Sequence, residues 1–426
     1  MAECVVVKFS SDSVRVGTDD LSNNVCDEGH SQVAGSVFGL YHIICLLISI
    51  TTFILDIGFD SWLAYIYYCQ GQGSYFALTV TFLIFPALIT TAFSLRWYII
   101  DGDEPTLSKP PLWKWVLRII MLLLQLAPIL RYCDALACGV HSITAGKAGN
   151  KLRQQKMYRK MLDEDSDAAL LRLFHCFLHA APQAILQLMI LIFHQSHASS
   201  VQAIQARAVI CSLVSVAWSL TSYHRSVRNA RDDKEKLEWQ GAVMQFCWHL
   251  MSTVSRVLAL SLLASLFPAW MGTVCLCHWC VMSAWLAVGH QHTAVCATRC
   301  EELLFSLVLG LAYILAFIAP RDGPTRYSYL AYYLVFFMEN TGALVVWCVA
   351  SSSAQNPVLY YGAVVAQVVA FLLALTFMLL YYRYFHPSGT STTLSKSISI
   401  TDPNMDLGKP GFYRYRWIGP HLLDVC

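Results

Sequence analysis

The chain has 426 residues, of which 56% are hydrophobic and 13% are charged, and its formal net charge is +2. The charged share is about half that of an ordinary soluble domain, which excludes a soluble globular protein and predicts an all-α polytopic membrane protein. We expect no nucleic-acid partner, and the orientation of the chain depends on where its Lys and Arg residues lie rather than on the net charge.

The two ends of the chain are predicted to be cytosolic tails. The first 36 residues are polar and lack both the apolar core and the small-residue cleavage site of a secretory signal. We therefore expect a cytosolic N-terminal tail at 1–36, a membrane domain at 37–385 and a cytosolic C-terminal tail at 386–426.

Ten apolar segments follow the first tail, each close to the roughly 20 residues that a spanning helix needs. They cover residues 37–69, 76–100, 112–140, 169–194, 205–223, 241–267, 271–289, 302–319, 327–350 and 358–385. The basic stretches 145–167 and 225–236 divide them into groups of three, two and five, and should face the cytosol. If both tails are cytosolic, eight segments span the membrane and two enter it without crossing. Such non-crossing backbone requires a polar interior.

Charged side chains recur inside these segments. They are Asp56, Asp60, Arg118, Arg131, Asp134, Arg172, Arg256 and Glu339. Each costs roughly 2.5–3.5 kcal/mol in the hydrocarbon centre unless it faces a partner or water. Asp56 and Asp60 share one helix face, so their like charges need nearby cations. Arg131, Arg172 and Arg256 are the candidates. The set predicts a charged internal track, and the alternative is a group of structural ion pairs.

Other motifs give no support for an enzyme. The stretch "HSITAGKAGNK" lacks the glycine spacing and the Ser or Thr of a phosphate-binding loop, so we expect no nucleotide site and no ATP-driven transport. The cluster "CLCHWC", from Cys275 to Cys280, points its groups in different directions on an apolar helix, so we expect no metal there. Most of the 16 Cys residues lie in apolar segments and should pack as small side chains. No cofactor is predicted.

Several further strings occur in order along the chain. They are "FILDIGFDSWLAYIYY", "LLRLFHCFLHAAPQAILQL", "SVAWSLTSYHRSVR", "SRVLALSLLASLFP", "HWCVMSAW", "DGPTRYSYLAYYLVFFMEN" and "YYRYFHP". Together they resemble the XK-related family of membrane proteins, over nearly the whole predicted membrane domain.

The resemblance implies a fold of two similar helical halves, with eight spans and two half-inserted segments. It also implies a lipid function. Several members scramble phospholipids, including phosphatidylserine, between leaflets without an energy source, often at the plasma membrane after caspases remove a tail in apoptosis. Other members bind membrane or lipid-transfer proteins. Matched by motif, Asp56, Asp60, Arg172 and Arg256 are expected to line a lipid track. We add the neighbouring candidates Arg131, Asp134, His175, His179 and Glu339.

The chain departs from the family pattern at two positions. His175 and His179 stand where the resemblance leads us to expect Glu in "LFExFLExAPQ". Both side chains titrate near neutrality and lie one helical turn apart. One alternative is a hydrogen-bonded pair without functional effect. The other is a track whose lipid movement changes between about pH 5.5 and 7.5. Arg172 loses its expected carboxylate partners, for which Asp134 or Glu339 could substitute.

Regulation by caspases is not expected. Neither tail contains a clean Asp-x-x-Asp site, and "EDSD", which ends at Asp167, lies where the fourth segment begins. Three functions remain open. They are a phospholipid scramblase, an XK-like partner that docks a lipid-transfer protein or accessory subunit without moving lipid itself, and a transporter of solutes or ions along the same track.

Overall fold

The computed structural model describes residues 38–102, 112–123, 126–193, 199–230, 236–289, 299–317, 326–351 and 357–386. These residues form helices joined by short turns, and none of them lies in a strand, which confirms the predicted all-α class. The N-terminal tail predicted at 1–36, and the C-terminal tail beyond residue 386, lie outside the described residues.

Eight helical stretches in the described residues are long and apolar enough to cross a membrane, as predicted. They are α2 (Leu40–Cys69), α3 (Gly73–Gly102), the continuous run of α6 (Lys151–His175), the π-helical turn η1 (Cys176–Ala180) and α7 (Ala181–Phe193), then α8 (Ser199–Ala230), α9 (Trp239–Leu266), α10 (Pro268–Gly289), α12 (Arg326–Ala350), and α13 (Pro357–Leu380) with the π-helical turn η2 (Tyr381–Phe385).

Two of the ten predicted segments do not form such spans. Segment 112–140 is divided between α4 (Leu112–Leu123) and α5 (Ala127–Lys147). Segment 302–319 overlaps α11 (Arg299–Ala312), which has 14 residues. At roughly 1.5 Å per residue α11 is about 21 Å long, shorter than the hydrocarbon core of about 30 Å. The two segments agree with the expected arrangement of eight spans and two segments that do not cross.

The first basic stretch is a helical hairpin rather than a loop. Helix α5 ends at Lys147, and Gly149 takes a left-handed conformation with φ of 74°, which glycine adopts without steric cost. The side chain of Asn150 then accepts a hydrogen bond from the Arg153 N–H at 3.0 Å and caps α6. Most of the Lys and Arg residues of this stretch therefore lie on the first turns of α6.

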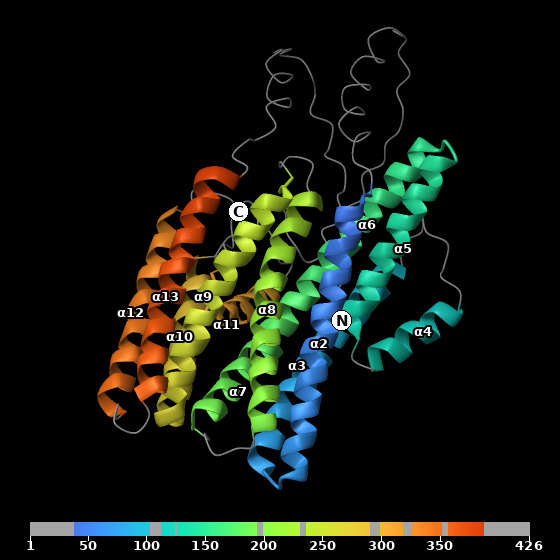
Figure 1. The fold of residues 1–426 in the computed structure, drawn as a ribbon. Helices are drawn as coiled ribbons and strands as arrows, with labels where there is room; N and C mark the ends of the chain where they lie inside the picture. The colour runs from blue at the N-terminus through green and yellow to red at the C-terminus, as the bar shows by residue number, and fades with distance from the viewer. Residues whose placement is uncertain are drawn as a thin grey trace.

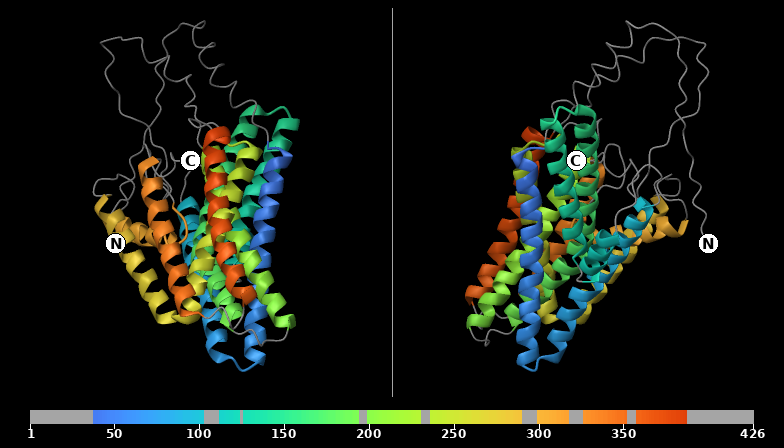
Figure 2. Two further views of the ribbon diagram at one scale, coloured as in Figure 1. Left: turned by 60° about the vertical axis from the view of Figure 1, so that its left-hand side comes forward. Right: turned by 90° about the vertical axis from the view of Figure 1, so that its right-hand side faces the viewer.

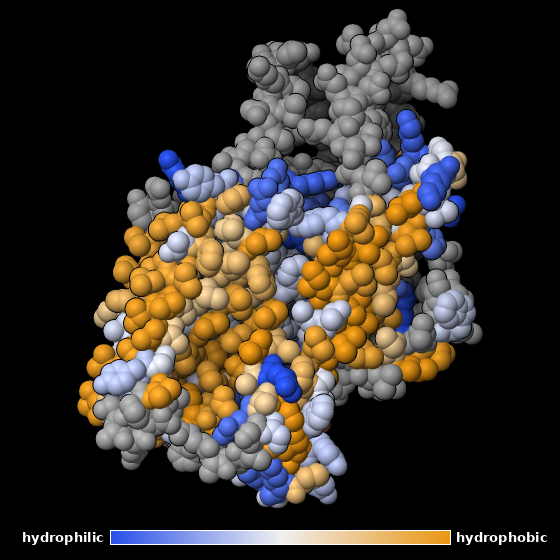
Figure 3. All heavy atoms as spheres, viewed as in Figure 1, coloured by the Kyte–Doolittle hydropathy of each residue, from blue (hydrophilic) through white to orange (hydrophobic). Residues whose placement is uncertain are grey.

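Three spans form the centre of the bundle. The run α6–α7, α8 and α9 are the most buried of the eight, and α9 packs against α7, α8, α12 and α13. Figures 1 and 2 show α2, α3 and α5 on one side of this centre and α10, α12 and α13 on the other. The face drawn in Figure 3 is mostly hydrophobic between two more hydrophilic ends, as expected of a surface that contacts lipid chains.

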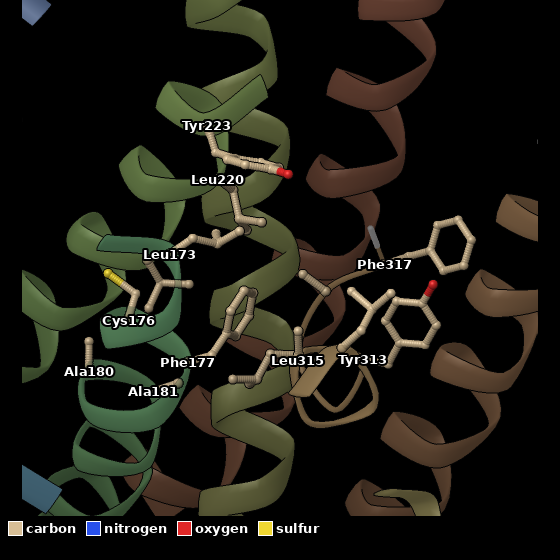
Figure 4. Close-up of a cluster of buried hydrophobic side chains, with 14 of the residues drawn as sticks. Leu173, Cys176, Phe177, Ala180, Ala181, Leu220, Tyr223, Tyr313, Leu315 and Phe317 are labelled. Carbon is tan, nitrogen blue, oxygen red and sulfur yellow. The ribbon is translucent and has the colours of Figure 1, made fainter. Parts of the chain in front are cut away.

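The largest hydrophobic cluster joins the central spans to α11 and α12. It combines Leu173 and Phe177 from α6–η1 with Leu220 from α8, and with Tyr313 and Phe317 from the turn that follows α11 (Figure 4). The short helix α11 is thus held against the central spans by the residues that follow it. The polar residues described below lie on the same central helices.

Candidate functional site

A row of polar side chains follows one face of the continuous helix α6–η1–α7. Its members recur every three or four residues, which places them on the same side of a helix. They are Arg172, His175, His179, Gln183 and Gln187, all of them buried. Asp165, also buried, extends the row about two turns before Arg172. We call this row, from Asp165 to Gln187, the polar stripe.

The polar stripe is as long as the hydrocarbon layer of a membrane. From Asp165 to Gln187 the helix rises about 33 Å at roughly 1.5 Å per residue, compared with a hydrocarbon core of about 30 Å. Packing alone does not require such a row, because small residues and isolated hydrogen bonds hold membrane helices together. The stripe is therefore the strongest candidate for a functional feature in the described residues.

The helix that carries the stripe contains a π-helical turn at η1. Pro182 has no N–H to donate to the carbonyl four residues earlier, and the N–H of Ala181 bonds to the carbonyl of Cys176, five residues earlier. Single π turns of this kind are frequent at functional sites. Across this turn the ring centroids of His175 and His179 lie 4.7 Å apart. The two imidazoles therefore meet inside the bundle.

The carboxylates of α2 lie opposite the two imidazoles. Asp56 and Asp60 are both buried on α2, in line with the expectation that they share a face. Asp60 Oδ2 is 3.0 Å from His179 Nε2, and Asp56 Oδ2 is 3.9 Å from the same nitrogen. The Ser212 hydroxyl of α8 donates to Asp56 Oδ1 at 2.7 Å. The side chain that faces both carboxylates is thus His179. Two of the three arginines expected near them, Arg131 and Arg256, pair with other carboxylates.

The backbone of α3 fixes the orientation of His179. Its Nδ1 lies 2.8 Å from the Phe82 carbonyl oxygen. Pro86, four residues after Phe82, has no N–H for that carbonyl. Because a carbonyl oxygen only accepts hydrogen bonds, Nδ1 carries a proton. The other ring nitrogen, Nε2, then faces the two carboxylates of α2, and its contact of 3.0 Å with Asp60 Oδ2 is an ion pair when Nε2 carries a proton as well.

Arg172 contacts neutral oxygens. Its guanidinium donates to the Ser49 carbonyl, to Thr52 Oγ1 at 2.5 Å and to Ser215 Oγ at 3.3 Å. Among the described residues, no carboxylate oxygen lies within 4.0 Å of it. Arg172 packs beside α2 one to two turns before Asp56, so its nitrogens meet backbone and hydroxyl oxygens first. The expected ion pair with Asp56 is therefore absent from this part of the chain.

Arg131 belongs to a separate buried cluster between α5 and α6. Its Nη1 donates to Glu164 Oε2 at 2.7 Å and lies 3.5 Å from Asp167 Oδ2. The Arg131 Cζ atom lies 3.8 Å from the centroid of the Tyr98 ring, and the Tyr98 hydroxyl donates to Asp134 Oδ2 at 2.8 Å. These partners hold Arg131 at the α5–α6 contact, and Asp134 does not substitute as a partner for Arg172.

The acidic string "EDSD" lies inside α6. Asp165 Oδ2 is 3.4 Å from Arg225 Nη2 of α8, and both side chains are buried. The other two carboxylates of the string are the partners of Arg131. A protease cannot reach buried carboxylates in a folded helix. The start of the basic stretch 225–236 is helical, because α8 continues to Ala230, and residues 231–235 lie outside the described part.

A second polar cluster lies among α9, α10 and α12. Arg256 Nη2 is 2.5 Å from Glu339 Oε2, its Nε donates to the Ile314 carbonyl at 2.7 Å and its Nη1 donates to Asn340 Oδ1 at 3.0 Å. His278 Nδ1 lies 2.8 Å from Glu339 Oε1. We call these five residues the C-terminal cluster. Glu339 is thus the partner of Arg256, so neither residue pairs with the polar stripe.

A pocket of about 440 Å³ lies beside the C-terminal cluster. Arg256 and Glu339 form its charged part, and apolar side chains of the same three helices, such as Leu260, Trp270 and Val346, form the rest. Two cysteines of "CLCHWC", Cys277 and Cys280, are exposed, whereas Cys275 is partly buried. In the part of the chain that the structure describes, the cysteines are free thiols.

The neutral members of the polar stripe were not among the predicted site residues. Gln183 and Gln187 follow His175 and His179 at intervals of four residues, and this interval marks one helix face. Gln187 accepts a hydrogen bond from the Tyr67 hydroxyl of α2 at 2.5 Å. Counting only charged residues hides this row, because an amide adds no formal charge. A search for any polar residue at helical spacing would have found it.

Comparison with known proteins agrees with this arrangement of apolar spans and buried charges. Residues 44–387 match the model of the XK-related protein family. The chain is 26% identical over 368 residues to "XK-related protein 8" of Gasterosteus aculeatus, covering 83% of this chain and 86% of the relative. It is also 26% identical over 367 residues to "Cell death abnormality protein 8" of Caenorhabditis briggsae, covering 82% and 79%. The chain belongs to the XK-related family.

Proposed function

We propose that the protein is a phospholipid scramblase, which moves phosphatidylserine and other phospholipids between the leaflets of a membrane without ATP. The observation that supports this most is the polar stripe, because its length of about 33 Å is close to the thickness of the hydrocarbon core. A headgroup that crosses hydrocarbon alone loses its water at a high free-energy cost. A polar row across the same distance replaces part of that hydration.

The chemistry of the stripe suits a phospholipid headgroup. Arg172 has neutral partners, so its guanidinium can exchange them for a phosphate and bind it through two hydrogen bonds. Asp56 and Asp60 supply negative charge for an ammonium group. Gln183 and Gln187 offer neutral donors and acceptors further along, where binding stays weak enough for release, as in a multi-site ion pathway.

The stripe is covered in the conformation described. Tyr67 of α2 donates to Gln187, and Gln205 of α8 donates to the Tyr67 hydroxyl at 2.9 Å. Ser212 of α8 bonds to Asp56 of α2. Helices α2 and α8 therefore close over the stripe, and lipid movement requires them to part from α6–α7. The structure corresponds to a closed state of the proposed scramblase.

The family relationship supports the same proposal. One relative is named for cell death, which fits the exposure of phosphatidylserine at the plasma membrane of a dying cell. We place the present chain in that membrane as part of the proposal, with phospholipids as its partners. An accessory membrane subunit or a lipid-transfer protein is a further partner to test.

The first experiment reconstitutes the purified chain into liposomes with a fluorescent phosphatidylserine analogue. A membrane-impermeant reductant then reports how fast the analogue moves to the outer leaflet. The full-length chain is compared with a version that ends at Pro387. Scrambling by either form supports the proposal, and scrambling by the shorter form alone indicates control by the tail. Absence of scrambling by both folded forms contradicts intrinsic activity and favours the docking-partner alternative.

A second experiment tests the stripe itself. Gln183→Leu and Gln187→Leu remove polar contacts and nearly preserve volume. Losing one such contact costs a passing headgroup about 1–2 kcal/mol, so each variant should scramble about tenfold more slowly. Gln367→Leu is the matched control, because Gln367 is a buried glutamine on α13 that bonds to Ser255 outside the stripe. Equal rates for all three variants would contradict a path along the stripe.

A further inference from the structure

We propose that Asp56, His175 and His179 form a buried binding site for a transition-metal dication of the zinc type, between α2 and the α6–η1 junction. In the described residues these three side chains are each buried, and their ligand atoms all lie within 4.8 Å of one another. Ligand atoms at roughly 2.0–2.1 Å from a tetrahedral zinc ion lie about 3.3 Å apart. Small side-chain movements would therefore bring these three atoms to bonding distance.

The centre of this site contains buried polar atoms without hydrogen bonds. Asp56 Oδ2, His175 Nε2 and His179 Nε2 have no hydrogen-bond partner in the described part of the chain. The contact of 3.0 Å between His179 Nε2 and Asp60 Oδ2 requires a proton on Nε2 to be favourable, and a metal ion bound at Nε2 would replace that proton. Burying such atoms unsatisfied costs about 1–3 kcal/mol each, and a bound cation would satisfy several of them together.

Neighbouring groups form hydrogen bonds with these ligands and orient them, as such bonds do in known metal sites. The bond from His179 Nδ1 to the Phe82 carbonyl turns Nε2 toward the carboxylates. Ser212 holds Asp56 Oδ1 and leaves Oδ2 directed at the site. Asp60 Oδ2, next to the same imidazole nitrogen, is the nearest source of a fourth ligand. The first ligands are therefore held in place before a metal arrives.

Charge and ligand type select the class of ion. Two ionised carboxylates are neutralised by one dication, which removes net charge from a position buried in hydrocarbon. Imidazole nitrogens with carboxylate oxygens suit zinc and related ions, whereas calcium takes 6–8 oxygen ligands. Two histidine ligands among so few oxygens therefore favour a zinc-type ion over calcium or magnesium.

A metal here would also link α2 to α6–η1. Asp56 belongs to α2, whereas His175 and His179 belong to the helix that carries the polar stripe. An ion bound to both would oppose their separation. This last consequence, that the metal keeps the stripe closed, rests on the proposed function, whereas binding itself does not.

The test measures metal on the purified full chain in detergent. The protein is stripped with a chelator, equilibrated with zinc chloride or calcium chloride, and dialysed, and the bound metal is counted by mass spectrometry. We expect close to one zinc ion per chain, no retained calcium, and a higher melting temperature with zinc. Wild-type protein that retains no zinc above the buffer level, or that retains calcium equally, overturns the proposal.

Variants locate the ion. His175→Gln, His179→Gln and Asp56→Asn should each bind zinc at least tenfold more weakly. His249→Gln removes another buried histidine, on α9, and Cys280→Ser removes an exposed thiol; both should bind like the wild type. Loss of binding in the two control variants, or full binding in all three site variants, would contradict the assignment.

A spectroscopic measurement keeps the test valid if a site variant fails to fold. Cobalt(II) added to the stripped wild-type chain should give the visible absorption of a tetrahedral site with nitrogen and oxygen ligands. Zinc should remove that absorption at an equimolar amount. A spectrum dominated by thiolate-to-cobalt charge transfer would place the ion on cysteines and overturn the proposal.

Discussion

The polar stripe and the C-terminal cluster each bury an arginine among apolar helices, but they surround it differently. Arg172 contacts a carbonyl and two hydroxyl groups. Arg256 contacts the carboxylate of Glu339 as well as two neutral oxygens. The first arginine lies beneath α2 and α8, whereas the second borders a pocket.

This difference predicts that the guanidinium of Arg172 is available to a phosphate, whereas that of Arg256 is already neutralised by Glu339. A phosphate that approaches Arg256 must compete with a carboxylate already bound to it. A phosphate that approaches Arg172 displaces only neutral acceptors, which are weaker partners of a guanidinium. Four substitutions test this distinction. Three compare the arginines that are paired with carboxylates, Arg131 and Arg256, with Arg172, and the fourth compares the pocket with the polar stripe.

Arg131→Met is expected to have the largest effect on stability. It leaves the buried carboxylates of Glu164 and Asp167 without their shared guanidinium. Removing one partner of a buried ion pair costs about 3–5 kcal/mol. Thermal unfolding in detergent measures the loss. Arg118→Met is the control, because Arg118 is partly exposed and lies 3.9 Å from Asp134, so its removal should cost less than about 1 kcal/mol. Similar losses in the two variants would contradict the structural role of Arg131.

Arg256→Met should destabilise the protein by about 2–3 kcal/mol. Its partner Glu339 has a side chain that is 26% exposed, so water offsets part of the loss. The double variant Arg256→Met with Glu339→Leu should recover much of the stability, because no buried charge is left alone. If the double variant is as unstable as the sum of the two single variants, the pair is not coupled.

Arg172→Met should cost only about 1 kcal/mol of stability, because it removes hydrogen bonds to neutral groups and leaves no carboxylate unpaired. Its effect on lipid movement should be much larger. Loss of a charge-assisted phosphate contact, worth about 1.5–3 kcal/mol, slows scrambling about tenfold or more. The liposome assay measures the rate, with Arg172→Lys as a variant that keeps the charge. A stable Arg172→Met protein that scrambles normally would remove Arg172 from the path.

The number of spans was predictable from the sequence because it depends on local features. Apolar length and the placement of Lys and Arg both act within one segment or one loop. They gave ten segments, and eight spans followed from the further expectation that both tails are cytosolic. The helical hairpin at Gly149 and Asn150 was also readable, since a glycine followed by a capping residue is a local signal. Basic composition alone suggested a loop there.

The partners of the buried charges were not predictable in the same way. Arg172 meets Ser49, which lies 123 positions away in the sequence, and that contact depends on how far each helix is rotated and shifted. Nothing local in the sequence fixes those quantities. The orientation of His179 depends on a carbonyl of α3 that Pro86 leaves without a donor. The sequence shows the proline but not the helix that packs against it.

Gly342→Leu should have the smallest effect on stability and distinguishes the two regions most directly. Gly342 lines the pocket beside the C-terminal cluster, and an added Cβ there would meet nothing within 4 Å. The Cβ of leucine therefore has room, and we expect the rest of the side chain to enter the pocket and stability to change by no more than about 0.5 kcal/mol.

If lipid follows the polar stripe, scrambling by Gly342→Leu stays at the wild-type rate while Gln183→Leu slows it. The opposite result, a slow Gly342→Leu and a normal Gln183→Leu, would move the path to the pocket. In that case the ion pair of Arg256 and Glu339 would have to open for each headgroup. The presence of a carboxylate partner would then no longer distinguish an arginine that stabilises the fold from one that binds passing lipid.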